Sequence, residues 1–263
     1  MSSPQPPIVS VRFDRAVSLA RELDFDGAQP LHFGAPRATS SAFRIGSFEG
    51  DVARGASCNC RSITLIPHCN GTHTESVGHL TRTATPLHRF VPLAPIPALL
   101  LTLTVEDARE SGEDSLPAPH AGDQLLTARA LRTHWPRKLP VTPRALLLRT
   151  AGTQHSTTNP PYLSRQAATE IVARGIEHLV LDLPSADRTE DEGRLAAHRI
   201  FFGLPDGSTE ELAATRRQCT ITELAQFPAH LRDGPCALLL QLPAFTGDAV
   251  PSRPIYLPLT PAQ

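Results

Sequence analysis

Short apolar runs bounded by turn residues mark the chain from residue 99 onward. They lie at residues 99–105, 145–150, 178–183 and 236–243, with a shorter run at 220–224. Continuous apolar runs of this length are typical of strands that are covered on both faces. The pattern therefore predicts five strands.

A helix is predicted between two of these strands. Ser164 is a favourable N-cap for a helix over residues 165–174, and Gly175 follows as a stop signal. A strand, a helix and a strand at this spacing match a parallel crossover unit. The sequence thus predicts an α/β fold with a mixed sheet and flanking helices. No segment reads as a linker, so we expect a single domain over residues 1–263.

The first half predicts fewer regular elements. Residues 12–23 carry a modest apolar stripe, which favours a helix, and the loop at 24–34 follows it. Residues 43–48 and 62–67 read as two strands with a glycine-containing turn between them. Residues 110–122 are polar and predict an exposed loop.

Composition removes several classes of function. The 263 residues carry a formal net charge of −1, and 40% of them are hydrophobic. No basic field indicates nucleic acid as a partner, and no stretch approaches the roughly 20 apolar residues that cross a bilayer. Lys138 is the single lysine, so mechanisms that depend on a lysine, such as Schiff-base formation, have almost no candidate residue. A small molecule is therefore the expected partner, with neither nucleic acid nor membrane.

The five cysteines are an odd number, and the N-terminal residues lack the pattern of a signal peptide. We therefore expect a reduced, cytoplasmic protein. Cys58 and Cys60 lack the second pair that a structural zinc site requires, and are expected as buried or pocket-lining thiols. Cys69 is expected to face away from the neighbouring histidines.

The densest polar chemistry lies in residues 66–80. His68, His73, Glu75 and His79 fall within twelve positions there. On an extended segment the last three share one face, because their numbers have the same parity. Imidazoles with a carboxylate are the ligands of a catalytic divalent ion, and this mixture favours Zn or Mn over metals that prefer thiolates. The sequence therefore predicts a metal site.

The pattern HxxGTHxExxxH resembles the HxGTHxDxPxH signature of the cyclase family of metal-dependent hydrolases, which includes bacterial kynurenine formamidase and isatin hydrolase. Further similar segments follow in the family's order: RTAG at 149–152, NPPYLS, LDLPSAD at 181–187, AAHRIFFG and TITEL. The resemblance implies a swivelling β/α/β domain, one or two metal ions, and an oligomer, expected as a homodimer or homotetramer.

The resemblance also implies roles for single residues. His68, His73 and Glu75 stand at ligand positions, Glu75 where the family has an aspartate that can bridge two ions. His198, expected on a later strand, and Glu223 of TITEL stand at two further ligand positions. His79 stands at the position of the catalytic histidine. Phe25, Gln29 and Pro30 lie in a loop similar to one that reaches the substrate in the family.

Three departures from the signature change these expectations. One extra residue precedes Gly71, which in an extended segment turns His68 to the opposite face unless a bulge absorbs it. Glu75 is one methylene longer than aspartate, and Val77 replaces a proline. A remodelled site, with one ion and not two, is one consequence. His68 is accordingly the least secure ligand.

The function that the residues and the resemblance predict is hydrolysis of an amide, formamide or lactam C–N bond. A lyase or isomerase that stabilises an enolate is an alternative, since the same ion would polarise a carbonyl. A family member that binds a small acid or a metal without turnover is another. Arg253 either anchors a substrate carboxylate or is a surface residue of a proline-fixed turn.

Overall fold

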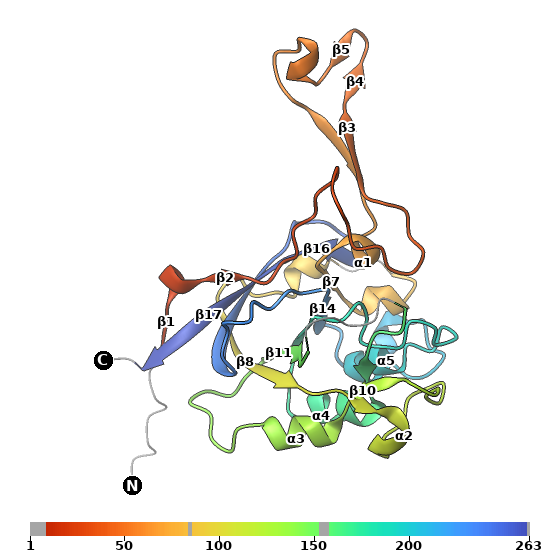
Figure 1. The fold of residues 1–263 in the computed structure, drawn as a ribbon, viewed down its shortest axis with the longest axis vertical. Helices are drawn as coiled ribbons and strands as arrows, with labels where there is room; N and C mark the ends of the chain where they lie inside the picture. The colour runs from red at the N-terminus through yellow and green to blue at the C-terminus, as the bar shows by residue number, and fades with distance from the viewer. Residues whose placement is uncertain (1–8, 84–85, 153–157, 262–263) are drawn as a thin grey trace.

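The computed structural model describes residues 9–83, 86–152 and 158–261. A ten-stranded mixed sheet runs through the body of the protein in the order β1-β17-β15-β8-β11-β13-β14-β7-β16, and β2 pairs with β17 (Figure 1). Its strands are β1 (Val9–Val11), β2 (Val17–Ser18), β7 (His73–Glu75), β8 (Ile96–Leu103), β11 (Ala145–Thr150), β13 (His178–Leu181), β14 (Thr220–Glu223), β15 (Gly234–Gln241), β16 (Ala249–Pro251) and β17 (Arg253–Pro261).

The central strands form the predicted parallel crossover. Strand β11 has the predicted bounds and pairs in parallel with both β8 and β13, while β13 pairs in parallel with β14. Helix α4 (Arg165–Ala173) connects β11 to β13, and the hydroxyl of Ser164 accepts a hydrogen bond from the Ala167 amide as its N-cap. The mixed α/β fold predicted from the sequence is therefore confirmed.

Helices cover one face of this sheet. The helices besides α4 are α1 (Pro67–Asn70), α2 (Ala108–Ser111), α3 (Ala128–His134) and α5 (Ala196–Phe202). Short 3-10 turns occur at η1 (Phe13–Arg15), η2 (Val52–Arg54), η3 (Val77–Leu80), η4 (Leu87–Arg89) and η5 (Glu211–Ala213). Leu131 of α3, Ile171 of α4 and Phe201 of α5 pack in one buried cluster with leucines of β8, β11 and β13.

The alternate residues of the same strands pack on the other face. Leu100, Leu147 and Val180 join Leu238 and Tyr256 from β15 and β17 in a second buried cluster. Side chains of a strand point alternately to its two faces, so a strand buried on both needs apolar residues throughout. This double burial explains the uninterrupted apolar runs in the sequence.

Two smaller regions stand beside the main sheet. Strands β9 (Glu106–Asp107), β10 (Gln124–Leu126) and β12 (Tyr162–Leu163) form a three-stranded sheet. Strands β3 (Thr39–Ala42) and β6 (Arg61–Thr64) pair as a hairpin that continues into β4 (Arg44–Ile45) and β5 (Phe48–Glu49). This second region, residues 39–64, projects from the body and is called the arm here (Figure 1).

The first 50 residues differ from the prediction. The helix predicted over residues 12–23 is wrong: the chain forms η1 and then β2, which pairs with β17, and only Leu19 becomes fully buried. The edge of β17 supplies main-chain partners that a local apolar stripe cannot reveal. Residues 43–48 form two short strands and not one, because the chain turns at Gly46, whose φ is +55°.

No helix in the described ranges combines the length and apolar character needed to span a membrane.

Candidate metal centre

Strand β7 carries two of the predicted ligands between β14 and β16. Antiparallel pairing with β14 places His73 opposite Glu223, and pairing with β16 places Glu75 opposite Ala249. The side chains of His73, Glu75 and Glu223 are almost completely buried, and His73 Nε2 lies 3.4 Å from Glu223 Oε2. Residues directly opposite each other on one face of a sheet have neighbouring side chains. The strand register thus builds one side of the centre.

His198 approaches these carboxylates from a helix. It lies on α5 and not on the expected strand, because the apolar run at 200–202 packs one face of a helix against the sheet. His198 Nε2 is 2.8 Å from Glu75 Oε1 and 3.4 Å from Glu223 Oε1. The helix therefore brings a third side chain onto the two glutamates.

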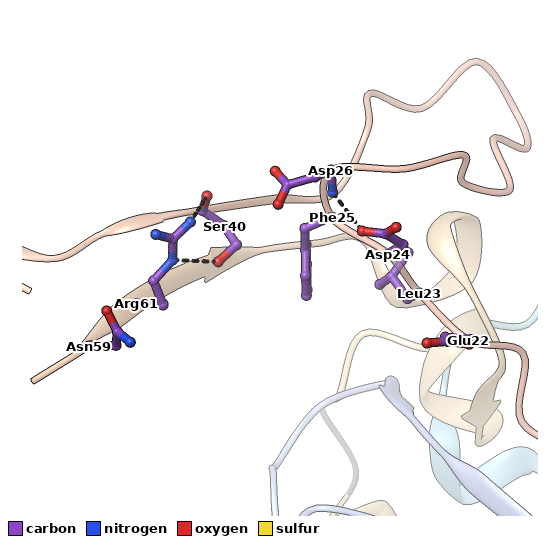
Figure 2. Close-up of a pocket in the computed structure, with 8 residues that line it drawn as sticks. All are labelled: Glu22, Leu23, Asp24, Phe25, Asp26, Ser40, Asn59 and Arg61. Carbon is purple, nitrogen blue, oxygen red and sulfur yellow. Dashed lines mark hydrogen bonds between the residues drawn. The ribbon is translucent and has the colours of Figure 1, made fainter. Parts of the chain in front are cut away.

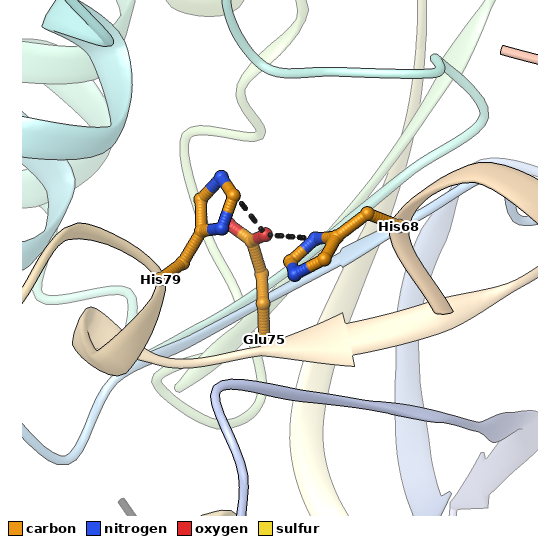
Figure 3. Close-up of side chains that lie close together, drawn as sticks. All are labelled: His68, Glu75 and His79. Carbon is orange, nitrogen blue, oxygen red and sulfur yellow. Dashed lines mark ion pairs between the residues drawn. The ribbon is translucent and has the colours of Figure 1, made fainter. Parts of the chain in front are cut away.

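His68 also reaches the Glu75 carboxylate, on the other side of it from His79 (Figure 3). It lies on the helical turn α1, which accommodates the extra residue before Gly71, so the alternation of an extended segment does not apply. His68 Nδ1 is 3.1 Å from Glu75 Oε2. The structure consequently places His68 with the other candidate ligands.

His79 lies on the 3-10 turn η3 after β7, so the parity argument does not apply to it either. Its Nε2 is nevertheless 3.9 Å from Glu75 Oε2, and its ring centroid is 4.2 Å from that of His68. The side chain is 27% exposed, whereas that of Glu75 is 1% exposed. His79 is therefore the most exposed of the four histidines in the cluster.

Buried polar atoms test whether these residues fit a cation. Among the described residues, His73 Nε2, His198 Nε2 and both carboxylate oxygens of Glu75 are buried, and their close partners are one another and the neighbouring ionisable side chains, such as His198 Nε2 at 2.8 Å from Glu75 Oε1. The other ring nitrogens are held: His73 Nδ1 donates to the carbonyl of Gly71 at 3.0 Å and His198 Nδ1 to Asp187 Oδ2 at 2.6 Å. Histidines that bind a metal show this arrangement. The residues fit a divalent cation.

The ligand-type atoms form two groups that share one residue. His68, Glu75 and His79 make one group, and His73, Glu75 and Glu223 make the other, each with atoms within 4.8 Å of one another. A carboxylate common to two groups is suited to a bridging position. The geometry of the centre accommodates one ion or two.

The charges of the cluster are strongly coupled. Burial opposes ionisation of Glu75, but the imidazoles of His79 and His198 hold the pKa of this carboxyl well below its ordinary value. Burial also opposes a charge on His68, yet the neighbouring carboxylates of Asp248 and Glu75 raise its pKa to about 10. A ligand nitrogen must lose its proton before it binds a metal. Metal binding here should therefore release protons.

The sequence matches the family model "Putative cyclase" over residues 16–188. This chain belongs to the cyclase family. The resemblance predicted from the motif is confirmed at the level of the family. No curated protein matches the chain.

Solved structures share the fold of this cyclase-family chain. A predicted metal-dependent hydrolase from Bacillus stearothermophilus has a TM-score of 0.59 at 16% identity, over 92% of this chain and 98% of that one. Isatin hydrolase A from Labrenzia aggregata, bound to benzyl benzoate, has a TM-score of 0.59 at 14% identity, over 93% of each chain. Isatin hydrolase A from Ralstonia solanacearum has a TM-score of 0.55 at 15% identity, over 93% of this chain and 92% of that one.

The three residues of the predicted substrate loop line two different hollows of the structure. Gln29 and Pro30 line a cavity of about 990 Å³. The amide of Gln29 is occupied by main-chain groups of Asp24 and Ala38, so it fixes the loop. Phe25 lines a different hollow at the root of the arm (Figure 2), and the candidate ligands are among the lining residues of neither space. Of the three residues, Pro30 is the one whose side chain remains available to the cavity.

Two carboxylates of the centre were not predicted as site residues. Asp187 holds His198 and also accepts hydrogen bonds from the amides of Ala197 and His198 at the start of α5. It belongs to the LDLPSAD segment, so the family resemblance contained a signal for it. Asp248 lies 2.8 Å from His68 Nε2. Nothing in the local sequence of Asp248 indicated this contact, because strand pairing brings it there.

The remaining chemical candidates lie outside the centre. Cys58 and Cys60 are exposed, which contradicts the buried alternative of the expectation that they are buried or pocket-lining thiols, because the arm has no core of its own. Cys69 is buried, and burial raises the pKa of its thiol. Arg253 is exposed, and its Nε donates to the Ser18 hydroxyl at 3.4 Å, which agrees with a surface arginine.

Proposed function

We propose that this cyclase-family protein is a metal-dependent hydrolase that opens an amide, formamide or lactam C–N bond of a small molecule. One observation carries the proposal. The buried Nε2 atoms of His73 and His198 converge on the buried carboxylates of Glu223 and Glu75, while the opposite ring nitrogens are fixed. Two carboxylates gathered in the interior cost free energy unless their charge is compensated, and a cation bound between these ligand atoms supplies that compensation.

His68, His73, His198, Glu75 and Glu223 would hold the ion or ions. When bound, Zn or Mn supplies Lewis acidity, which polarises a carbonyl and makes water a better nucleophile. His79 is the proton carrier in this proposal. Its ring is partly exposed and stands beside Glu75, where it can give a proton to the leaving nitrogen and recover one from solvent.

The cavity of about 990 Å³ is the proposed place of the substrate. Thr102, Thr150 and Asp182 line it at or just beyond the carboxyl ends of β8, β11 and β13, where open α/β sheets bind ligands. Leu224, also in its lining, follows Glu223 and accepts a hydrogen bond from the Thr72 hydroxyl at 2.7 Å. The cavity thus adjoins the strand that carries His73.

The names of two neighbours support this class of substrate. Isatin hydrolases appear among the structures that share the fold, and one of them is described as bound to the product analogue thioisatinate. Isatin contains a lactam, so these proteins open the type of bond that we propose. For this chain the substrate class rests on that analogy and on the metal chemistry of the centre.

Metal analysis followed by a substrate screen tests the proposal. We expect the purified protein to retain Zn or Mn, and His73→Ala to lose most of it. N-formyl amines, lactams and cyclic imides are then incubated with the metal-loaded protein, and ring-opened or deformylated products are measured by mass spectrometry. Protein without metal and without metal-dependent thermal stabilisation would overturn the proposal. Bound metal with no hydrolysis would favour the lyase, isomerase or binding alternatives.

We also propose that the protein is a homodimer or homotetramer in which the arm packs against another copy. Phe43, Ile45 and Ile63 of the arm are 40%, 65% and 56% exposed. Exposed apolar side chains gathered on one element are typical of interaction surfaces. Light scattering should show an oligomer that Ile45→Glu with Ile63→Glu dissociates, while the exposed Leu212→Glu on the body leaves it intact. A monomeric wild-type protein would contradict this part of the proposal.

A further inference from the structure

Asp248 is brought to the candidate centre by strand pairing from outside the segment that matches the family model. It immediately precedes β16, whose Ala249 pairs with Glu75 of β7. The Ser76 amide donates to the Asp248 carbonyl at 3.0 Å, which fixes the main chain at this point. The position of the Asp248 carboxylate is therefore set by the same sheet that sets Glu75.

The carboxylate of Asp248 faces two histidines. Its Oδ2 is 2.8 Å from His68 Nε2 and 3.8 Å from His79 Nδ1. Only the first distance is that of a hydrogen bond. His68 thus lies between two carboxylates, with Nε2 toward Asp248 and Nδ1 toward Glu75.

We infer that Asp248 is a positioning residue of the metal centre: it accepts the Nε2 proton of His68 and so holds Nδ1 toward the cation. The inference rests on the proposed function, because it assumes that a cation binds beside Glu75. His73 and His198 would present the opposite nitrogen, Nε2, since their Nδ1 atoms are already used. A proton acceptor behind a ligand histidine fixes both its tautomer and its ring orientation.

His68 needs this support more than the other two histidines do. Its side chain is 20% exposed and sits on a helix of four residues, whereas those of His73 and His198 are 0% and 1% exposed. Packing holds the buried rings in place, but the ring of His68 has open space on one side. The hydrogen bond to Asp248 compensates for that missing packing.

Asp248 offers a cleaner test of positioning than Asp187. Asp187 also accepts hydrogen bonds from two main-chain amides of α5, so its replacement would disturb the helix. The side chain of Asp248 is 50% exposed, and its ion-pair partners within the described residues are the two histidines. Replacing Asp248 should therefore leave the fold intact.

The experiment is a titration of metal-free full-length protein with Co²⁺ and Zn²⁺, read by visible absorption of Co²⁺ and by thermal stability. We expect Asp248→Ala and Asp248→Asn to weaken binding by about 10- to 100-fold and to change the Co²⁺ spectrum. Asp248→Glu should recover part of the affinity. Asp206→Ala, which removes an exposed carboxylate from a surface turn, serves as the control and should match wild type.

The same substitution in a His68→Ala protein distinguishes positioning of His68 from a general effect of the Asp248 charge on the cation. If Asp248 acts through His68, then Asp248→Ala should cause little further loss in a His68→Ala protein. Equal loss in both backgrounds would overturn the inference, as would wild-type affinity in Asp248→Ala. A wild-type protein that binds neither metal overturns the proposed function as well, so the two failures are distinguishable.

Discussion

The arm and the candidate metal centre are adjacent in the sequence but opposite in environment. All four residues of β6, the last strand of the arm in the sequence, are exposed, whereas all three residues of β7 are buried. The arm exposes apolar side chains such as Ile63, and the centre buries charged groups such as Glu75. Each reverses the usual distribution of polar and apolar residues. Under the proposals above, each region gains an interaction that a single polypeptide chain does not supply: a cation for the centre and a second protein surface for the arm.

Replacing Glu75 should have the largest effect, because it belongs to both groups of candidate ligands. We expect Glu75→Gln to lower metal affinity by at least about 100-fold, more than the loss of a supporting residue, and to abolish activity. Metal content is measured after gel filtration. Ile63→Ala on the arm is the matched control and should keep wild-type metal. Full metal content in Glu75→Gln would show that the buried carboxylate of Glu75 is not needed to hold a cation.

His79→Ala should separate catalysis from metal binding within the centre. We expect metal content to stay near that of wild type while kcat falls by about 10²- to 10⁴-fold, the usual contribution of a positioned acid or base. Metal analysis comes first and rates with an identified substrate come second. If His79→Ala loses metal as Glu75→Gln does, His79 is a ligand and another residue carries the proton.

Core and arm should also differ in their contribution to stability. Leu147 is fully buried between β8 and β13, so Leu147→Ala should lower the free energy of unfolding by about 2–5 kcal/mol. Ile63→Ala, at an exposed position, should change it by less than about 0.5 kcal/mol in the isolated chain. Urea unfolding measures both. A cost for Ile63→Ala that grows with protein concentration would indicate that a second copy covers the arm.

The same contrast explains what the sequence predicted well. Strand β11 and helix α4 have nearly the predicted bounds, because burial on both faces and a clear N-cap at Ser164 leave strong local signals. His73 and Glu75 could be selected because the motif places them two residues apart on one strand. Local pattern is sufficient where local structure determines the environment.

The remaining features depend on partners that are distant in the sequence. Residues 12–23 carry a helical stripe but pair with the edge of β17 near the other end of the chain. Asp248 lies 180 residues from His68, with which it makes its closest contact. The placement of His198 on a helix depends on packing of α5 against the sheet. Such contacts arise from topology, which a single sequence does not encode locally.

The last of the predicted effects concerns the pH dependence of the body. His178 is buried on β13, and burial lowers its pKa to about 4, while the arm contains no histidine. Between pH 6.5 and 4 the unfolded chain therefore binds a proton on this residue that the folded chain excludes, and acidification lowers the free energy of unfolding. The difference between the two pKa values corresponds to roughly 3 kcal/mol, fully present above pH 6.5 and lost toward pH 4.

In His178→Asn the amide nitrogen can replace Nδ1, which lies 2.9 Å from the Thr220 hydroxyl, without a titrating ring. Unfolding by urea at several pH values, with a chelator present so that metal ligands contribute equally, should show a shallower decline for the variant than for wild type. Parallel curves would mean that His178 gains its proton in the folded protein as readily as in the unfolded chain.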